Sequence, residues 1–507
     1  MKNRTILYTL FWLLSICMYS QVSQKYTIWV RLKNEQAKPQ KSVSTNTKTK
    51  NTGLNAVFVQ NQVIRYKQAL PFAKNPKLLE IYEIILKGNP EKFKEVINKE
   101  YPNMFKDWTI KPKPITTYEP SDSMWLLTRQ NPDQWMWYLP RIQAEKAWDI
   151  THGSEDVTIA IIDSKFDILH PDLVNKFIVN YDPLTGIAHQ GIQFWGNGLY
   201  ENHGTSVASA AIGQTDGGGH MAAIGFDTRF YGYTLENNVD TGFYADLDIG
   251  IAKALHASNV MQANIISISW YYPEIGPDPD DALIIKEIID NGTIICASAG
   301  NGINDNKSGE LYPFGTGNDS RIIKVSTTGK SDCHTYGGRT NSHYPGVDIC
   351  APGEGTILAV PSVGNAWPYW NTNGETSFAT PLVAGVCALM LSVNPCLTPV
   401  QTETILKNTA DPILDANLFP GMVGAGRVNA YKAVKEAGTR TYINTTFTGN
   451  QYLSAGYCFN LTNVSIGGNS RIKLDARKEV HIIRSFNVPL GSTLSININP
   501  EARTNSQ

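Results

Sequence analysis

Three short apolar runs in the middle of the chain most constrain its fold. They are Val157–Ile162, Ile265–Ser269 and Thr293–Ala297, and they alternate with helices made of small residues. Apolar runs of this length are typical of strands buried on both faces, as in a parallel sheet covered by helices. Residues 137–438 are therefore predicted to form an α/β domain in three layers, with a mostly parallel central sheet.

Composition places few limits on partners but allows a large core. The chain has 507 residues, of which 42% are hydrophobic and 18% charged, and its formal net charge is -1. So little net charge gives no field over the whole surface that would attract nucleic acid or an anionic membrane, and we expect neither as a partner.

The N-terminus has the features of a secretory signal peptide. Lys2 and Arg4 precede an apolar stretch from Ile6 to Met18, which ends at polar residues 19–21. The stretch is too short to span a bilayer comfortably, so residues 1–20 are predicted to be removed on export. The mature chain is then expected to lack an integral membrane segment and to be secreted or held at the cell surface.

The segments on either side of the α/β domain differ from it in pattern. Residues 21–136 begin with a strand-like stretch, Tyr26–Leu32, and continue with apolar positions at helical spacing between Leu78 and Leu86. Residues 439–507 alternate polar and apolar residues, and pairs such as Val464 and Ile466 recur eight residues apart. We expect an N-terminal unit ending in a linker, and a small β-rich C-terminal module built as a solenoid or a sandwich.

Six cysteines remain after removal of the signal peptide, and the sequence leaves their pairing open. A domain of this size does not depend on disulfides for its stability. Cys296 lies within an apolar run and is predicted to be a small buried hydrophobic residue.

An acid, a base and a nucleophile occur in the same chain, each in a suitable setting. Asp163 follows the first apolar run, His203 begins a helix of small residues, and Ser377 lies at the start of an apolar helix. A serine hydroxyl becomes a good nucleophile when an imidazole accepts its proton, and a carboxylate fixes the tautomer of that imidazole. The carboxyl ends of parallel strands are also where ligands bind in open α/β sheets.

Two further features would stabilise an oxyanion beside Ser377. Free backbone N–H groups converge at a helix start, and Pro381 cannot donate a hydrogen bond back to the carbonyl of Ser377. Asn301 follows the third apolar run and can present its side-chain amide to the same oxyanion.

Taken together, these residues resemble the subtilisin-like serine peptidase family over about residues 137–438, and the order Asp, His, Ser is the one that subtilisin uses. The resemblance implies catalytic roles for Asp163, His203, Ser377 and Asn301. It also implies a substrate-binding strand and a pocket floor, made of Ser267, Ser269, Trp270 and Tyr271, and of Ala297, Ser298, Ala299 and Gly300. The stretches Val347–Gly353 and Gly424–Ala430 are similar to later structural landmarks of the family.

Three residues depart from the family pattern. Lys165 and Glu375 stand where glycine is usual, after Asp-Ser and before Thr-Ser, and Tyr271 stands where a glycine commonly borders the substrate cleft. A carboxylate at residue 375 would raise the pKa of His203 and shift activity to higher pH. The ring of Tyr271 would narrow or redirect the first substrate pocket.

The sequence thus predicts a secreted serine endopeptidase that acts on proteins or peptides. The resemblance implies that residues 21–136 are an inhibitory pro-region that assists folding, and the alternative is a permanent accessory domain. The C-terminal module is expected to attach the protein to a surface, to bind substrate or to act as a stabilising cap. The resemblance implies no cofactor for the reaction, and calcium as a structural ion without assignable ligands.

Two other functions fit parts of the sequence. The departures at Lys165, Glu375 and Tyr271 would suit a binding or adhesive protein on a catalytically weakened peptidase scaffold. A carboxyl-peptidase relative with a glutamate base is a third alternative, and His203 within His-Gly-Thr-Ser argues against it.

Overall fold

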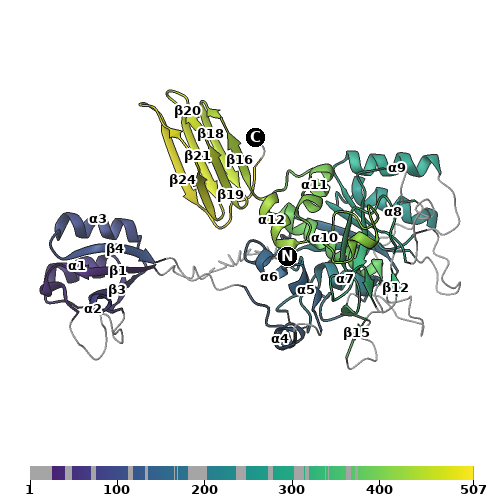
Figure 1. Cartoon of the computed structure of the whole chain (residues 1–507), viewed down its shortest axis with the longest axis horizontal. Coiled ribbons are helices and arrows are strands. Elements are labelled where there is room, and N and C mark those ends of the chain that lie inside the picture. The colour runs from purple at the N-terminus through teal and green to yellow at the C-terminus, as the bar shows by residue number, and fades with distance from the viewer. Residues whose placement is uncertain are drawn as a thin grey trace, which may run out of the picture. The chain divides into compact units, whose positions relative to one another are not determined.

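The computed structural model describes residues 26–39, 48–69, 76–111, 118–131, 135–164, 166–167, 169–180, 203–217, 219–235, 247–271, 278–301, 313–314, 319–336, 339–340, 342–360, 367–371 and 375–505. The predicted signal peptide and Lys165 lie outside these residues. The chain divides into two compact units, Met1–Thr116 and Thr117–Gln507, and each is described by itself (Figure 1).

The first unit is an antiparallel sheet with helices. Its elements are β1 (Tyr26–Leu32), α1 (Thr52–Gln60), β2 (Val63–Gln68), α2 (Pro76–Leu79), β3 (Ile81–Leu86), α3 (Pro90–Glu100) and β4 (Phe105–Lys111). The strand order is β2-β3-β1-β4, which is the β-α-β-β-α-β arrangement of ferredoxin-like units. Strand β1 has the predicted bounds. The helix predicted from the apolar spacing between Leu78 and Leu86 was wrong, because residues 81–86 form the central strand β3, which pairs with β1 and β2.

The second unit begins earlier in the chain than the predicted linker allowed. Helix α4 (Ser123–Gln130) buries Met124 and Trp125 in the core of this unit, and the backbone N–H of Met124 donates to the carbonyl of His220 at 2.9 Å. Residues 118–131 therefore belong to the second unit and not to a solvent-exposed connection.

The second unit is built on a seven-stranded parallel sheet. Its strand order is β13-β10-β9-β8-β5-β7-β6, and each neighbouring pair is parallel. The strands are β5 (Thr158–Asp163), β6 (Phe177–Asn180), β7 (Arg229–Thr234), β8 (Ile265–Ile268), β9 (Ile294–Ser298), β10 (Ile323–Thr328) and β13 (Ile349–Pro352). The three predicted apolar runs are β5, β8 and β9, which lie side by side at the centre of the sheet.

Alternate residues of these strands enter two separate cores. Ile159 and Ile161 pack in a core with α7 (His203–Ile212), α10 (Thr376–Val393) and α12 (Ala430–Ala437). Ala160 and Ile162 pack in the other core with α8 (Leu247–Asn259) and α9 (Pro279–Asp290). Because side chains alternate across a strand, a sheet covered on both faces needs strands that are apolar throughout. The structure confirms the three-layer α/β fold.

The remaining elements of this domain surround the two cores. They are α5 (Tyr138–Arg141), α6 (Ala144–Trp148), α11 (Pro399–Thr409), the 3-10 turn Ala416–Leu418, and the two-stranded sheets of β11 (Thr335–Tyr336) with β12 (Arg339–Thr340) and of β14 (Ile357–Ala359) with β15 (Tyr369–Asn371). Of the helices that the structure describes, α10 alone has the length and composition of a membrane span, and it is entirely buried inside the protein.

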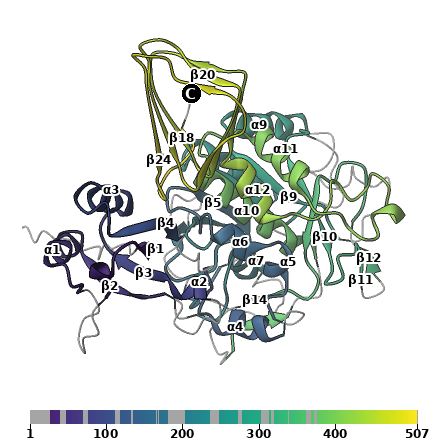
Figure 2. The same ribbon diagram turned by 60° about the vertical axis from the view of Figure 1, so that its left-hand side comes forward.

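The C-terminal module is a parallel β-solenoid of three coils. Its sheets have the orders β16-β19-β22, β17-β20-β23 and β18-β21-β24, with all pairs parallel. The strands are β16 (Arg440–Ile443), β17 (Thr446–Phe447), β18 (Asn450–Ala455), β19 (Cys458–Thr462), β20 (Val464–Ile466), β21 (Arg471–Ala476), β22 (Glu479–Ile482), β23 (Phe486–Asn487) and β24 (Thr493–Ile498). Figure 1 shows β24 outside β21 and β18, and Figure 2 shows β20 on another side of the stack.

The eight-residue recurrence in the sequence is the spacing between equivalent residues on successive sides of the solenoid, here β20, β21 and β22. Leu453 pairs with Leu474, and Leu474 pairs with Ile496, so a full coil takes 21 or 22 residues. The module is fixed to the α/β domain, since the N–H of Thr504 donates to the carbonyl of Val393 at 2.8 Å and Arg477 donates to the carbonyl of Ile150 at 2.7 Å.

The six cysteines in the described part of the chain are free thiols. Cys296 is fully buried, as predicted for a small hydrophobic residue, and its nearest thiol is that of Cys387 on α10. The neighbouring Cys387 thiol and burial raise the pKa of Cys296, which favours its neutral thiol form.

Candidate active site

Asp163 and His203 are held together at the carboxyl edge of the central sheet. Asp163 is the last residue of β5, and His203 is the first residue of α7. The Nδ1 atom of His203 lies 2.7 Å from Oδ1 of Asp163. Because a carboxylate only accepts, Nδ1 carries the proton, and Nε2 of the neutral ring is left as the basic nitrogen.

The turn after Asp163 also binds the start of α7. The Ser164 hydroxyl accepts a hydrogen bond from the backbone N–H of Gly204 at 2.9 Å, and the Asp163 carboxylate accepts one from the N–H of Ser164 at 2.7 Å. The first N–H groups of a helix have no partner within the helix, so this bond satisfies one of them. It also fixes the carboxylate and the imidazole in one rigid arrangement.

The surroundings of His203 favour its protonated form. Burial of the ring disfavours the charge, but the carboxylate of Asp163, its hydrogen bond and the charge of Glu375 together raise the pKa of His203. The predicted influence of Glu375 on this histidine therefore has the direction expected from the sequence. The ring of Phe378, with its centroid 5.4 Å from that of His203, packs beside the imidazole.

Ser377 lies in the first turn of α10, where Pro381 leaves its carbonyl without a helical partner. The Ser269 hydroxyl supplies the missing donor, 2.9 Å from the carbonyl oxygen of Ser377. In return, the Ser377 hydroxyl donates to the carbonyl of Ser269 at 3.3 Å. Ser269 and Ser377 thus hold each other through two hydrogen bonds at the start of α10.

Asn301 is fixed beside the same helix start. Its Oδ1 atom accepts hydrogen bonds from the backbone N–H and the hydroxyl of Thr376, each at 3.0 Å. With Oδ1 held by Thr376, the Nδ2 amide is the part of the side chain left to donate. The Thr376 hydroxyl also lies 3.1 Å from the carbonyl of Gly300, which ties residues 300–301 to α10.

The predicted substrate strand runs from β8 to Tyr271. The side chains of Ser267 and Ser269 are buried. The Trp270 indole donates to the carbonyl of Ile162 at 2.8 Å and packs edge-on against Phe314, so its ring belongs to the core between the sheet and α8.

The predicted pocket floor, Ala297 to Gly300, continues β9. Ala297, Ser298 and Ala299 are buried, and Gly300 adopts a positive φ of 78°, which favours glycine. Tyr271 packs on a small cluster that includes Ala299. Its burial and the charge of Glu375 raise the pKa of its hydroxyl, which stays protonated as a donor.

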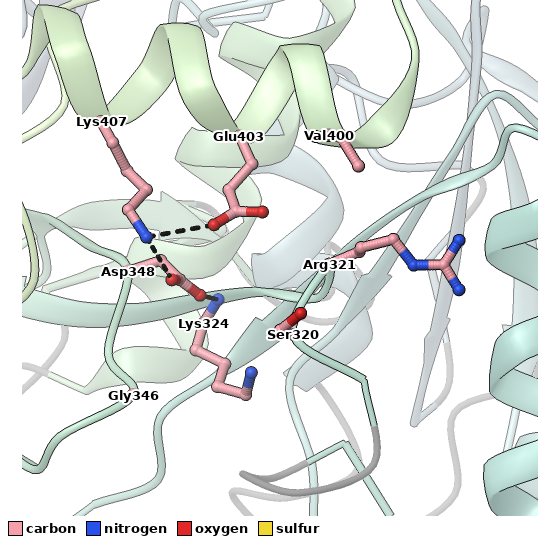
Figure 3. Close-up of a pocket in the computed structure, with 8 residues that line it drawn as sticks. All are labelled: Ser320, Arg321, Lys324, Gly346, Asp348, Val400, Glu403 and Lys407. Atoms are coloured by element: carbon pink, nitrogen blue, oxygen red, sulfur yellow. Dashed lines mark hydrogen bonds and ion pairs between the residues drawn. The ribbon is translucent and has the colours of Figure 1, made fainter.

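The landmark Val347–Gly353 has a structural function at Asp348. This carboxylate accepts from the Lys324 backbone N–H at 2.9 Å and from the Lys407 ammonium at 3.0 Å, and Lys407 also reaches Glu403 at 3.1 Å (Figure 3). These groups line a hollow of about 540 Å³ between α11 and β10, and none of its lining residues is a predicted site residue. The network joins α11 to the sheet.

No group of three or more His, Cys, Asp or Glu side chains suited to a metal ion occurs in the described ranges.

Comparison with known proteins shows the family of this α/β domain. The sequence model of the subtilase family, Peptidase S8, matches residues 154–440, which is more than half of the chain. The chain belongs to the subtilase family. The match includes all four of the predicted catalytic residues and the eight predicted substrate-binding residues.

Curated relatives of this subtilase align over the same region. It is 30% identical over 310 residues to halolysin of Haloferax mediterranei, which is 61% of this chain and 55% of halolysin. It is 29% identical over 302 residues to thermitase of Thermoactinomyces vulgaris, or 58% of this chain and 94% of thermitase. A thermophilic serine proteinase of Bacillus sp. strain AK1 is 27% identical over 295 residues, which is 57% of this chain and 64% of that proteinase. The chain thus covers less than two thirds of the length of two of these relatives.

A solved structure supports the fold alone. Fervidolysin from Fervidobacterium pennivorans, described as a keratinolytic enzyme related to subtilisin, has a TM-score of 0.50 at 19% identity. The similarity covers 81% of this subtilase and 61% of fervidolysin.

Several residues that shape the site had no role in the sequence prediction. Thr376 orients Asn301, and Ser342 donates to the carbonyl of Gly300 at 2.5 Å. The position of Thr376, directly before Ser377, was a usable signal. Ser342 lies outside every motif that the sequence analysis identified, and only the fold reveals its contact with Gly300.

Proposed function

We propose that this subtilase is an exported serine endopeptidase that uses Asp163, His203 and Ser377, with Asn301 in the oxyanion hole. The 2.7 Å bond between Asp163 and His203, set beside the start of α10, is the observation that most supports this proposal. Family membership supports the reaction class, hydrolysis of peptide bonds by an activated serine.

In the proposed reaction, the Ser377 hydroxyl rotates from the Ser269 carbonyl toward Nε2 of His203. Its oxygen attacks the substrate carbonyl carbon while Nε2 accepts its proton, and the negative charge moves to the carbonyl oxygen. The Asn301 amide and the backbone N–H of Ser377 donate to that oxygen. The imidazolium, which Asp163 stabilises, then gives its proton to the leaving amine as the carbon–nitrogen bond breaks.

Water completes the cycle by the same route in reverse. Nε2 of His203 accepts a proton from a water molecule, whose oxygen attacks the acyl ester on Ser377. The tetrahedral intermediate releases the carboxylic acid product, and the proton on His203 returns to the Ser377 oxygen.

Export and maturation are parts of the same proposal. The charged and apolar N-terminus supports secretion, and the compact first unit supports a pro-region that is cleaved from the mature enzyme. We further propose that structural calcium, with ligands still unassigned, adds to thermal stability without taking part in the reaction.

The experiment is mass spectrometry of the secreted protein from the wild type and from Ser377→Ala, together with a peptide-cleavage assay. The wild type should lack residues 1–20, lose its first unit and cleave peptides. The Ser377→Ala variant should retain the first unit and be inactive. Cleavage of peptides by purified Ser377→Ala would refute the assignment of the nucleophile.

A catalytically weakened binding protein is the second candidate. The specific observation in its favour is that the Ser377 hydroxyl donates to the Ser269 carbonyl. A wild-type protein that keeps its first unit and binds peptides without cleaving them would support this alternative.

A further inference from the structure

The two ends of the C-terminal solenoid differ in how their apolar interiors are covered. At the first coil, Phe447, Leu453 and Ala455 are buried. The guanidinium of Arg440 lies over the Tyr442 ring, 5.8 Å from its centroid, and donates to the Ser454 carbonyl at 3.2 Å. These contacts close the end of the solenoid that adjoins the α/β domain.

The last coil leaves the same interior open. Ile482, Ile496 and Ile498 are 48%, 40% and 55% exposed. Their register partners in the preceding coil are inward-facing and buried, namely Leu461, Leu474 and Ala476. The three isoleucines therefore continue the core and would be buried if another layer were stacked on them. Stacking is how solenoid repeats bury their apolar faces, and a terminal repeat ordinarily carries a polar cap.

The backbone at this end is open as well. Strands β22, β23 and β24 are each the last strand of their sheets, so within the described ranges no strand pairs with their outer edges. The segment after β24 turns back toward earlier coils, since the N–H of Asn499 donates to the carbonyl of Ala476 at 2.8 Å and that of Asn505 to the carbonyl of Ser454. The described C-terminal segment thus does not cover the edge.

Two of the three edge strands at this end, β23 and β24, lack the usual protection against edge pairing. Natural edge strands are commonly protected by lysine, proline or a bulge. Strand β24 reads Thr-Leu-Ser-Ile-Asn-Ile and β23 reads Phe-Asn, with no charge in either. On β22, Nε2 of His481 lies 3.1 Å from Oε1 of Glu479, so the two side chains pair with each other.

We propose that a second copy of this chain covers the open end, in a two-fold symmetric dimer of solenoids placed end to end. Turning one solenoid onto another reverses the direction of its strands, so β24 pairs antiparallel with β24 of the second copy. Two identical ends match in outline, and a neutral edge meets its own copy without like-charge repulsion. A strongly acidic or basic partner would find no complementary charge on β23 or β24.

The test uses the full chain carrying Ser377→Ala, which prevents self-digestion. Its mass is measured by light scattering after size exclusion, over a range of concentrations. We expect a dimer that Ile496→Lys converts to a monomer, because this places two like charges in the middle of the interface. The matched control is Ile443→Lys, a residue 59% exposed on the first coil, which should remain dimeric. A cooperative thermal unfolding transition in each variant will show that both are folded.

Amide hydrogen exchange gives a second measurement that does not depend on a variant. Exchange of residues 493–498 should slow as the protein concentration rises, because pairing protects their N–H groups. A monomer at every concentration, or a dimer that survives Ile496→Lys, would overturn the proposal. A monomer would leave the open end to a partner of different chemistry, and assemblies larger than a dimer would refute the closed two-fold arrangement.

Discussion

The hydrogen bond from Thr376 to Asn301 predicts that removing the Thr376 hydroxyl lowers kcat by less than removing the Asn301 side chain. Thr376 is fully buried, and its hydroxyl lies 3.0 Å from Oδ1 of Asn301 and 3.1 Å from the Gly300 carbonyl. A single hydroxyl proton serves both acceptors, so Thr376→Val removes about one hydrogen bond. The net free-energy contribution of such a hydrogen bond is about 0.5–1.5 kcal/mol. If it is lost from the transition state, kcat falls by about 2- to 12-fold.

This loss should be small because other contacts remain. The Thr376 backbone N–H still holds Oδ1 of Asn301, and the Gly300 carbonyl still accepts from Ser342. Asn301→Ala, in contrast, removes an oxyanion donor and should lower kcat by about 10²–10³. Substrate affinity should change little in either variant, because the oxyanion forms in the transition state.

The assay is steady-state cleavage of a chromogenic peptide by the two single variants and the double variant. If Thr376 acts through Asn301, Thr376→Val should have almost no further effect on kcat in the Asn301→Ala background. An equal fall in both backgrounds would refute the reasoning, because the effect would then arise elsewhere. Thermal unfolding of each variant checks that the fold is retained.

The other predictions concern electrostatics, packing and metal. Glu375→Gln should lower the pKa of His203 and move the acid limb of kcat/KM to lower pH, because neutral His203 is the base; an acid limb that moves to higher pH would contradict this. Ser269→Ala should cost about 1–3 kcal/mol of unfolding free energy by leaving the Ser377 carbonyl without its donor, measured by denaturant unfolding, and no loss would show that this bond is replaceable. A calcium chelator should lower the Tm of the mature enzyme without changing the rate at which folded protein reacts with a serine-directed probe; an unchanged Tm would refute structural calcium.

The central fold could be predicted from the sequence because its strands are buried on both faces. Val157–Ile162 is apolar at every position except Thr158, near its start, so its pattern predicts a strand in a parallel sheet covered on both faces. Asp163 directly follows that run. Because the carboxyl ends of parallel strands all lie at the same edge of the sheet, the position of Asp163 at that edge could also be predicted.

Residues 81–86 were wrongly predicted to be helical, because over so short a segment the spacing of apolar residues does not distinguish a helix from a strand. Ile81, Ile84 and Leu86 fit either pattern, and only pairing with β1 and β2 decides between them. The first residues of the second unit were placed in a linker because the burial of Trp125 depends on a distant part of the chain.

The site was predictable in its residues but not in its supporting bonds. Ser377 and Pro381 indicated a helix start with an unpaired carbonyl, yet the donor that fills it comes from Ser269, more than a hundred residues earlier. This contact depends on how the segment after β8 packs against α10, which cannot be inferred from the spacing of residues along the sequence.

The most direct test of the account is labelling with a fluorophosphonate probe, followed by mass spectrometry of the modified peptide. The mature wild type should carry the probe on Ser377, and His203→Ala should react about 10⁶-fold more slowly or not at all. A wild-type protein that has lost its first unit but leaves Ser377 unmodified, or a His203→Ala variant labelled at the wild-type rate, would contradict it.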